Sequence, residues 1–122
     1  MKSHLDDDKP IFQQICEMME EDILDEEIRE GDKIPSTNEI ANFYRINPAT
    51  AGKGIQSLVD KSIIYKRRGI GMFVEEGAKQ KLIEERKQEF MKNYVQPLIH
   101  EAKRLQVNKK EIISYLEKEE EI

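Results

Sequence analysis

Residues 36–61 read STNEIANFYRINPATAGKGIQSLVDK, and this stretch holds the start and stop signals of two short helices. Ser36 and Glu39 have the spacing of a capping box, in which each side chain accepts a hydrogen bond from the other residue's backbone N–H at a helix start. Asn47 followed by Pro48 is a second start signal, because asparagine is a favoured N-cap and proline is favoured at the first helical position. The short turn between the two helices predicts a helix-turn-helix.

Two glycines lie inside the second predicted helix, although an interior glycine costs about 1 kcal/mol relative to alanine. The surrounding AGKG is not a phosphate loop, because Asn47 and Gly54 stand where that loop needs a glycine and a hydroxyl residue. We expect Gly54 to lie beside Ile55 and Leu58 on the inner face, where a missing side chain lets the first helix pack close. Gly52 is expected to face outward.

After residue 61 the helical period gives way to two β-rich runs, Ile63–Lys66 and Met72–Val74. They are joined by Arg-Arg-Gly-Ile-Gly, in which Gly69 and Gly71 supply the backbone freedom that a hairpin connection needs. A helix-turn-helix followed directly by a hairpin with a basic tip is the winged-helix arrangement. The sequence therefore predicts a mainly α fold with one small β-hairpin.

The net charge of −5 is unevenly distributed along the 122 residues. Residues 1–32 carry three basic and twelve acidic side chains, and residues 75–122 carry ten and eleven. Residues 33–74 carry seven basic side chains against two acidic ones, a net charge of +5. We therefore expect a basic face on an otherwise acidic protein, and such a face attracts a polyanion locally.

Length and composition exclude several classes of protein. A chain of 122 residues has room for one domain with an appendage, not for two independent cores. No apolar run exceeds three residues, so the sequence predicts neither a membrane span nor a secretory signal and favours a cytoplasmic protein. Cys16 is the only cysteine and is expected to be a small core hydrophobe, since it has no disulfide partner within the chain. His4 and His100 lack partners at metal-ligand spacing. We predict no metal, no cofactor and no enzymatic activity.

The two ends of the chain carry further helical patterns. Before the predicted helix-turn-helix, apolar residues recur at helical spacing and indicate one buried stripe: Phe12, Ile15, Cys16, Met19 and Ile23. From residue 77 to about Leu105 the pattern predicts a long helical segment, which Pro97 should kink or divide. Asn108 and Glu111 have the spacing of another cap and predict a last helix. The acidic end, residues 117–121, is expected to be a solvated tail.

We place a boundary between a winged helix-turn-helix domain, residues 1–76, and a helical tail, residues 77–122. So short a tail cannot form a core of its own, and its apolar stripes need a partner surface. A second copy of the chain is the simplest partner, because homodimers are the commonest oligomers. The residues assigned to this self-association are Phe90, Met91, Tyr94, Val95, Leu98, Ile99, Ile112 and Leu116.

Residues 31–74, GDKIPSTNEIANFYRINPATAGKGIQSLVDKSIIYKRRGIGMFV, resemble the winged-helix domain of the GntR family of bacterial transcription regulators. The resemblance covers roughly residues 10–76 and includes the Pro-Ser entry, the Asn-Pro-x-Thr turn and the Arg-Arg-Gly-x-Gly wing. The ending LIHEAKRLQVNKKEIISYLEK, residues 98–118, is similar to that of the YtrA-type branch, which has no large effector-binding domain and dimerises through its tail.

The resemblance implies a repressor that binds double-stranded DNA as a homodimer at a near-palindromic operator, often controlling genes for an ABC-type transporter. Carried over by position, it assigns DNA contacts to the start of the first helix of the pair, the start of the second and the wing. These residues are Ser36, Thr37, Asn38, Asn47, Ala49, Thr50, Gly52, Lys53, Lys66, Arg68, Gly69 and Gly71.

The chemistry of the assigned residues supports these contacts. Ala49, Thr50 and Lys53 share one helical face, and the first turn of a helix placed end-on in the major groove reaches base edges. Alternation along a strand puts Lys66 and Arg68 on one face of the wing. Arg67 is expected on the opposite face, paired with acidic residues of the body.

The sequence departs from the family pattern at three positions. Asn38 stands where the family commonly has arginine, so a guanine or phosphate contact is missing or the preference shifts towards adenine. Glycines at 52 and 54 replace a common basic residue and a common alanine. Our hypothesis is that Gly52 lets the backbone of the recognition helix approach DNA closely.

Two other functions stay open on the sequence alone. The chain is alternatively an adaptor whose winged helix acts through protein contacts without DNA. Small-molecule sensing at the dimer interface around Phe90, Met91 and Tyr94 is a third, weaker interpretation. The sequence identifies no effector and no operator sequence.

Overall fold

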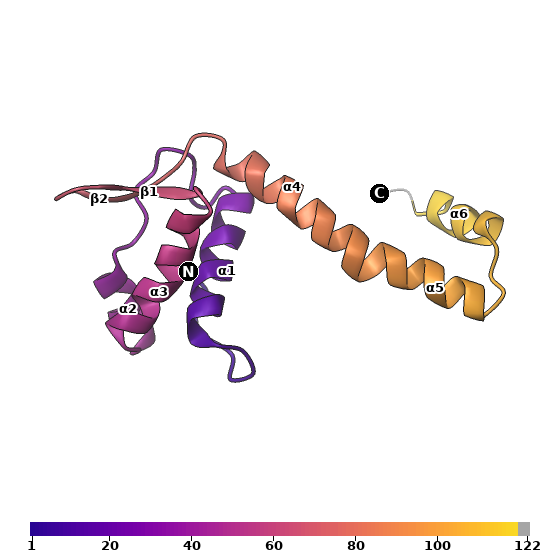
Figure 1. Ribbon diagram of the computed structural model, residues 1–122, viewed down its shortest axis with the longest axis horizontal. Helices are drawn as coiled ribbons and strands as arrows, with labels where there is room; N and C mark the ends of the chain where they lie inside the picture. Colours follow the sequence, from indigo (N-terminus) through magenta and orange to yellow (C-terminus); the bar gives the residue numbers. More distant parts are fainter. Residues whose placement is uncertain (120–122) are drawn as a thin grey trace. The chain divides into compact units, whose positions relative to one another are not determined.

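The elements of the first part of the chain follow the predicted order in a computed structural model, which describes residues 1–119. Three helices, α1 (Ile11–Leu24), α2 (Thr37–Tyr44) and α3 (Pro48–Asp60), precede a hairpin of β1 (Ile64–Arg67) and β2 (Gly71–Val74) (Figure 1). The last residues of the predicted acidic tail, from 120 onward, lie outside the described part. The mainly α fold with one small β-hairpin is confirmed.

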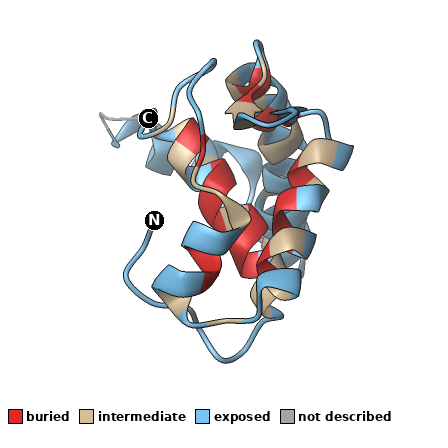
Figure 2. Cartoon of the chain, turned by 90° about the vertical axis from the view of Figure 1, so that its left-hand side faces the viewer, coloured by how far each residue is buried: buried red, intermediate tan, exposed pale blue. Residues whose placement is uncertain are grey.

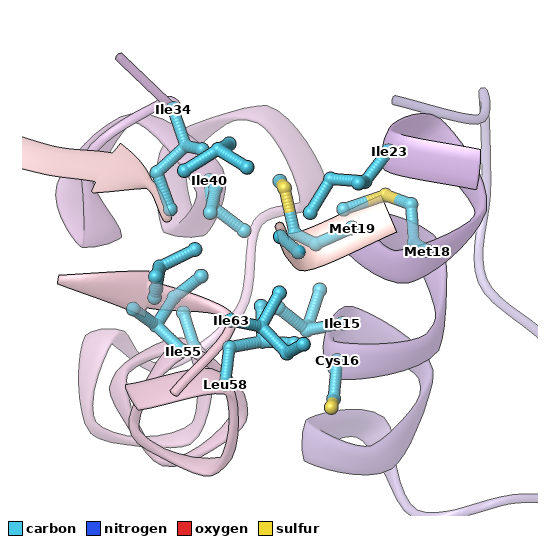
Figure 3. Close-up of a cluster of buried hydrophobic side chains, with 14 of the residues drawn as sticks. Ile15, Cys16, Met18, Met19, Ile23, Ile34, Ile40, Ile55, Leu58 and Ile63 are labelled. Carbon is cyan, nitrogen blue, oxygen red and sulfur yellow. The ribbon is translucent and has the colours of Figure 1, made fainter. Parts of the chain in front are cut away.

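The core lies between α1, α2, α3 and the base of the hairpin. Figure 3 shows the side chains of α1 meeting those of the other elements, and Figure 2 shows the buried segments on the inner faces of these helices. Of the stripe predicted on α1, Phe12 is partly buried and the other four residues are buried. The fully buried large side chains are Ile15, Met19, Ile23, Ile40, Ile55, Leu58, Ile63, Ile64, Val74 and Leu82.

The contact between α1 and α3 is closest at Gly54. A Cβ atom added at Gly54 would lie 2.6 Å from the backbone oxygen of Phe12 and 2.9 Å from the Cβ of Ile15. The predicted inner position of Gly54 is therefore confirmed, because any side chain there would separate the two helices. Gly52 differs from its outward prediction: it is partly buried, and an added Cβ would meet Cγ2 of Thr37 at 3.6 Å, an ordinary contact.

The start of α2 is fixed by the predicted capping box. The Ser36 hydroxyl accepts a hydrogen bond from the backbone N–H of Glu39 at 3.0 Å, and the Glu39 carboxylate accepts one from the backbone N–H of Ser36 at 3.2 Å. These hydrogen bonds to Ser36 are the main cause of a pKa of Glu39 below its ordinary value, and the charge of Lys33 acts in the same direction.

The turn between α2 and α3 depends on one residue in the left-handed conformation. Arg45 has φ +55°, and its backbone N–H and that of Ile46 both donate to the carbonyl of Ala41. Asn47 then caps α3, as predicted, by accepting a hydrogen bond from the backbone N–H of Ala49 at 2.8 Å, with Pro48 at the first helical position.

The first strand of the hairpin begins and ends one residue later than predicted. The second strand begins one residue earlier than predicted and ends at the predicted residue. Its antiparallel register joins Tyr65 to Phe73 and Arg67 to Gly71. Between them, the Ile70 backbone N–H donates to the Arg67 carbonyl at 2.9 Å, and Gly69 takes φ +76° in this turn. The left-handed backbone at Gly69 explains why a glycine is needed at the tip.

The second part of the chain is a series of helices: α4 (Ala78–Phe90), the π-helix η1 (Met91–Val95), α5 (Gln96–Arg104) and α6 (Lys109–Glu117). The predicted interruption at Pro97 takes the form of this π-helical turn, in which the Gln96 N–H donates to the Met91 carbonyl. Proline has no N–H and crowds the preceding turn, so a local change of helical pitch precedes it. Asn108 and Glu111 form the predicted cap of α6.

The boundary between compact units differs from the predicted boundary after residue 76. The chain divides into residues 1–84 and residues 85–122. The reason is that Ala78 and Leu82, at the start of α4, are fully buried in the core of the first unit. The first turns of the predicted tail therefore belong to the winged-helix core.

Replacing Gly54 with alanine is expected to lower the free energy of unfolding by about 1–3 kcal/mol, because the new methyl group would press on the Phe12 backbone. Urea unfolding of the purified chain measures this. The matched control is Gly52→Ala in the same helix, which should raise the free energy of unfolding by about 0.4–1 kcal/mol, because the methyl fits and the unfolded chain becomes less flexible. Equal effects of the two variants would contradict the close contact.

Replacing Ser36 with alanine is expected to lower the free energy of unfolding by about 1 kcal/mol through loss of the α2 cap, which urea unfolding measures.

The pKa of Glu39 is lowered on folding, so the ionised Glu39 side chain stabilises the fold. This stabilisation is complete above the ordinary pKa of 4.5 and is lost as pH falls through the lowered pKa. Glu39→Gln keeps the cap without a titrating group. Thermal melting against pH should therefore show a smaller acid destabilisation in Glu39→Gln than in the unaltered chain.

Candidate nucleic-acid interface

The predicted site residues of α2 lie in its first turn. Ser36 is the cap residue, and Thr37 and Asn38 follow it as the first two helical residues, with Asn38 exposed. The neighbouring helix approaches this turn, since a Cβ added at Gly52 would be in van der Waals contact with the Thr37 methyl group. The structure thus brings together the start of α2 and the first half of α3 (Figure 1).

The predicted site residues of α3 occupy its exposed first two turns. Ala49 and Lys53 are exposed, and Thr50 is partly exposed. The ammonium group of Lys53 lies 4.0 Å from the centroid of the Phe12 ring. Asn47 caps this end of the helix, where the helix dipole favours an anion. The arrangement can bind a polyanion at the start of α3.

The wing presents exposed basic side chains at its tip. Lys66 and Arg68 are exposed, and Gly69 and Gly71 have positive φ on either side of exposed Ile70. The described residues of the hairpin, from 64 to 74, include no acid that would repel a phosphate, whereas the first turn of α2 contains the exposed Glu39.

Arg67 differs from its predicted pairing with an acidic residue of the body. Its guanidinium lies over the Phe73 ring, 5.3 Å from the centroid, and Phe73 in turn stacks on Tyr65. The reason is the strand alternation, which places Tyr65 and Arg67 on the same face of β1 and opposite Phe73. Arg67 therefore packs on the aromatic pair of the wing.

Lys33 is a basic residue of this surface that the sequence analysis did not assign. It bridges to Phe73 of β2, and its Cε atom would lie 2.6 Å from a Cβ at Gly71. Its charge also contributes to the lowered pKa of Glu39 in α2. Lys33 therefore connects the base of the wing to the first turn of α2. Its place before Ile34-Pro35 in the basic third of the chain was visible in the sequence, but its contact with the wing was not.

Lys61 is a basic residue of the same third that is used internally. Its ammonium lies 2.9 Å from Oε2 of Glu20, whose side chain is only 5% exposed. A buried carboxylate requires such a partner. The +5 charge of residues 33–74 thus overstates what the surface offers to a ligand.

Two kinds of feature are absent from residues 1–119, the part of the chain that the structure describes. No group of three or more histidine, cysteine, aspartate or glutamate side chains in this range is arranged to hold a metal ion. None of the helices in the same range combines the length and the apolar character that crossing a bilayer requires.

Comparison with known proteins agrees with this geometry. The family model described as bacterial regulatory proteins, gntR family, matches residues 11–74. The HTH-type transcriptional repressor YtrA of Bacillus subtilis (strain 168) is 37% identical over 93 residues, which cover 76% of this chain and 71% of that protein. A GntR family transcriptional regulator from Listeria monocytogenes has a solved structure that is similar with a TM-score of 0.69 and 31% identity, covering 95% of this chain and 100% of the other.

A solved complex with DNA is also similar to part of this chain. The DNA-binding domain of AraR, in complex with operator ORX1, is 28% identical with a TM-score of 0.52 and covers 61% of this chain and 90% of its own. These relatives are transcription regulators and not enzymes. The match over more than half of the residues, together with the capped helix pair and the basic wing, shows that this chain belongs to the GntR family of bacterial transcription regulators.

Proposed function

We propose that this regulator is a repressor that acts in the cytoplasm and binds a near-palindromic operator as a homodimer. The observation that carries the proposal is the exposed basic surface of α3 and the wing, within the segment that matches the family. In this proposal Ala49, Thr50 and Lys53 approach base edges in the major groove, and Arg68 at the wing tip approaches the minor groove. The solved complex of the similar AraR domain with an operator supports DNA binding by this fold.

Phosphate contacts are proposed for the residues that surround this helix. The Asn47 end of α3 carries the positive end of the helix dipole, and Lys66 is an exposed cation on the wing. The remaining proposed contacts, at the start of α2, in α3 and in the wing backbone, are Ser36, Thr37, Asn38, Gly52, Gly69 and Gly71. We add Lys33, because it lies between the wing and α2.

The proposal of a homodimer is supported by the apolar surface of η1, α5 and α6. None of the residues in these three helices is buried. Phe90 is 55% exposed, Tyr94 68% and Leu98 49%, and Met91, Ile99 and Leu116 are exposed to a similar degree. Val95 and Ile112 are partly buried. So many exposed large apolar side chains support a protein–protein interface here. Two-fold pairing explains why the operator is expected to be near-palindromic, with half-sites about 34 Å apart.

The resemblance to the YtrA-type branch also favours genes for an ABC-type transporter as targets. Measuring transcript levels in a strain that lacks the regulator tests this part separately. A rise in transporter transcripts is expected for a repressor.

Selection from random-sequence DNA with the purified chain should yield one operator sequence, and gel shifts should give an affinity that falls with salt by about 0.9 logarithmic units per neutralised phosphate. Arg68→Ala and Lys53→Ala should each weaken binding, because each removes an exposed cation from the proposed interface. The matched control is Arg104→Ala in α5, whose guanidinium lies 3.0 Å from Glu101. It should leave affinity unchanged. Salt-independent binding, or no selected sequence, would support the adaptor function instead.

Leu98→Glu should convert the dimer to monomers, because a buried carboxylate without a partner opposes association. Sedimentation velocity measures the change. His100→Glu is the matched control on the opposite face of α5, since the two residues are two positions apart on a helix. It should leave the dimer intact. A monomeric unaltered chain would contradict the proposed assembly.

A further inference from the structure

The close contact at Gly54 has a consequence for the neighbouring residue Lys53. Because Gly54 has no side chain, the backbone of Phe12 lies directly against α3, with its oxygen 2.6 Å from the position of a Gly54 Cβ. The Phe12 ring is thereby held beside the exposed face of α3. Its ring is only partly buried, unlike the other members of the α1 stripe.

The ring of Phe12 lies beneath the charge of Lys53. The ammonium nitrogen is 4.0 Å from the ring centroid, well inside the range of a cation–π interaction. The ring occupies one side of the ammonium group, and a lysine ammonium has three N–H donors. Donors on the side away from the ring stay available to a phosphate or a base edge.

We propose that Phe12 is a positioning residue for DNA recognition, which holds Lys53 in place before the operator arrives. Lysine has four rotatable side-chain bonds and loses considerable conformational entropy when it is immobilised. A lysine already held on an aromatic ring loses less of that entropy on binding, which favours the complex. The inference rests on the proposed DNA binding and extends it to a helix outside the helix-turn-helix.

A double-mutant cycle tests the inference with the full chain and the selected operator. Phe12→Leu removes the ring and keeps an apolar side chain, and Lys53→Gln removes the charge. Phe12→Leu should weaken operator binding about two- to fivefold in the unaltered chain and leave it unchanged in the Lys53→Gln background. Phe12→Tyr, which keeps an aromatic face, should bind like the unaltered chain. An equal loss in both backgrounds would show that Phe12 acts through packing alone, and tighter binding by Phe12→Leu would show that the ring withholds Lys53 from DNA. Either result overturns the inference.

A measurement without DNA separates this inference from the proposed function. The ε-protons of Lys53 should show an upfield ring-current shift in the NMR spectrum of the free protein, lost in Phe12→Leu and kept in Phe12→Tyr. Unshifted protons would overturn the pairing itself. Failure of the unaltered chain to bind any selected DNA, with the ring-current shift present, would instead overturn the proposed function. Thermal melting of each variant confirms that the fold is retained.

Discussion

The close approach of α1 and α3 at Gly54 is the constraint on which the rest of the first unit depends. At this position the backbone of one helix lies where the other helix would carry a side chain. Helices that come this close bury their apolar stripes fully, as at Ile15, Ile55 and Leu58. The same approach places Phe12 under Lys53. A glycine that weakens α3 as an isolated helix therefore stabilises the packed unit and shapes its surface.

The charge that this protein presents at its surface depends more on what each charged side chain contacts than on the net charge of the chain. Of the basic residues in the middle third, Lys61 pairs with the buried Glu20, and Arg67 lies over Phe73. Lys33, in contrast, lies along the wing beside Gly71. A protein with a net charge of −5 thus keeps local exposed basic side chains within the segment that matches the family. Local placement, not net charge, governs attraction of a polyanion at short range.

The helices after residue 84 have a different relation to their apolar residues. The first unit buries most of its large apolar side chains within itself, whereas η1, α5 and α6 bury none. Their caps and helical pattern are well formed, as the Asn108 box shows. Stable local structure with an uncovered apolar surface is understandable when the covering partner is another chain, because the free energy of burial is then gained on association.

The sequence by itself determined the local elements, because caps, turns and helical periods depend on neighbours a few residues apart. The Ser36 box, the Asn47-Pro48 start, the inner place of Gly54 and the hairpin were all predictable for this reason. Only the tertiary structure decided contacts between distant segments. It placed Gly52 against Thr37, put Arg67 on Phe73 and extended the first unit to residue 84. Such contacts follow from the packing of whole elements, which no spacing along the chain encodes.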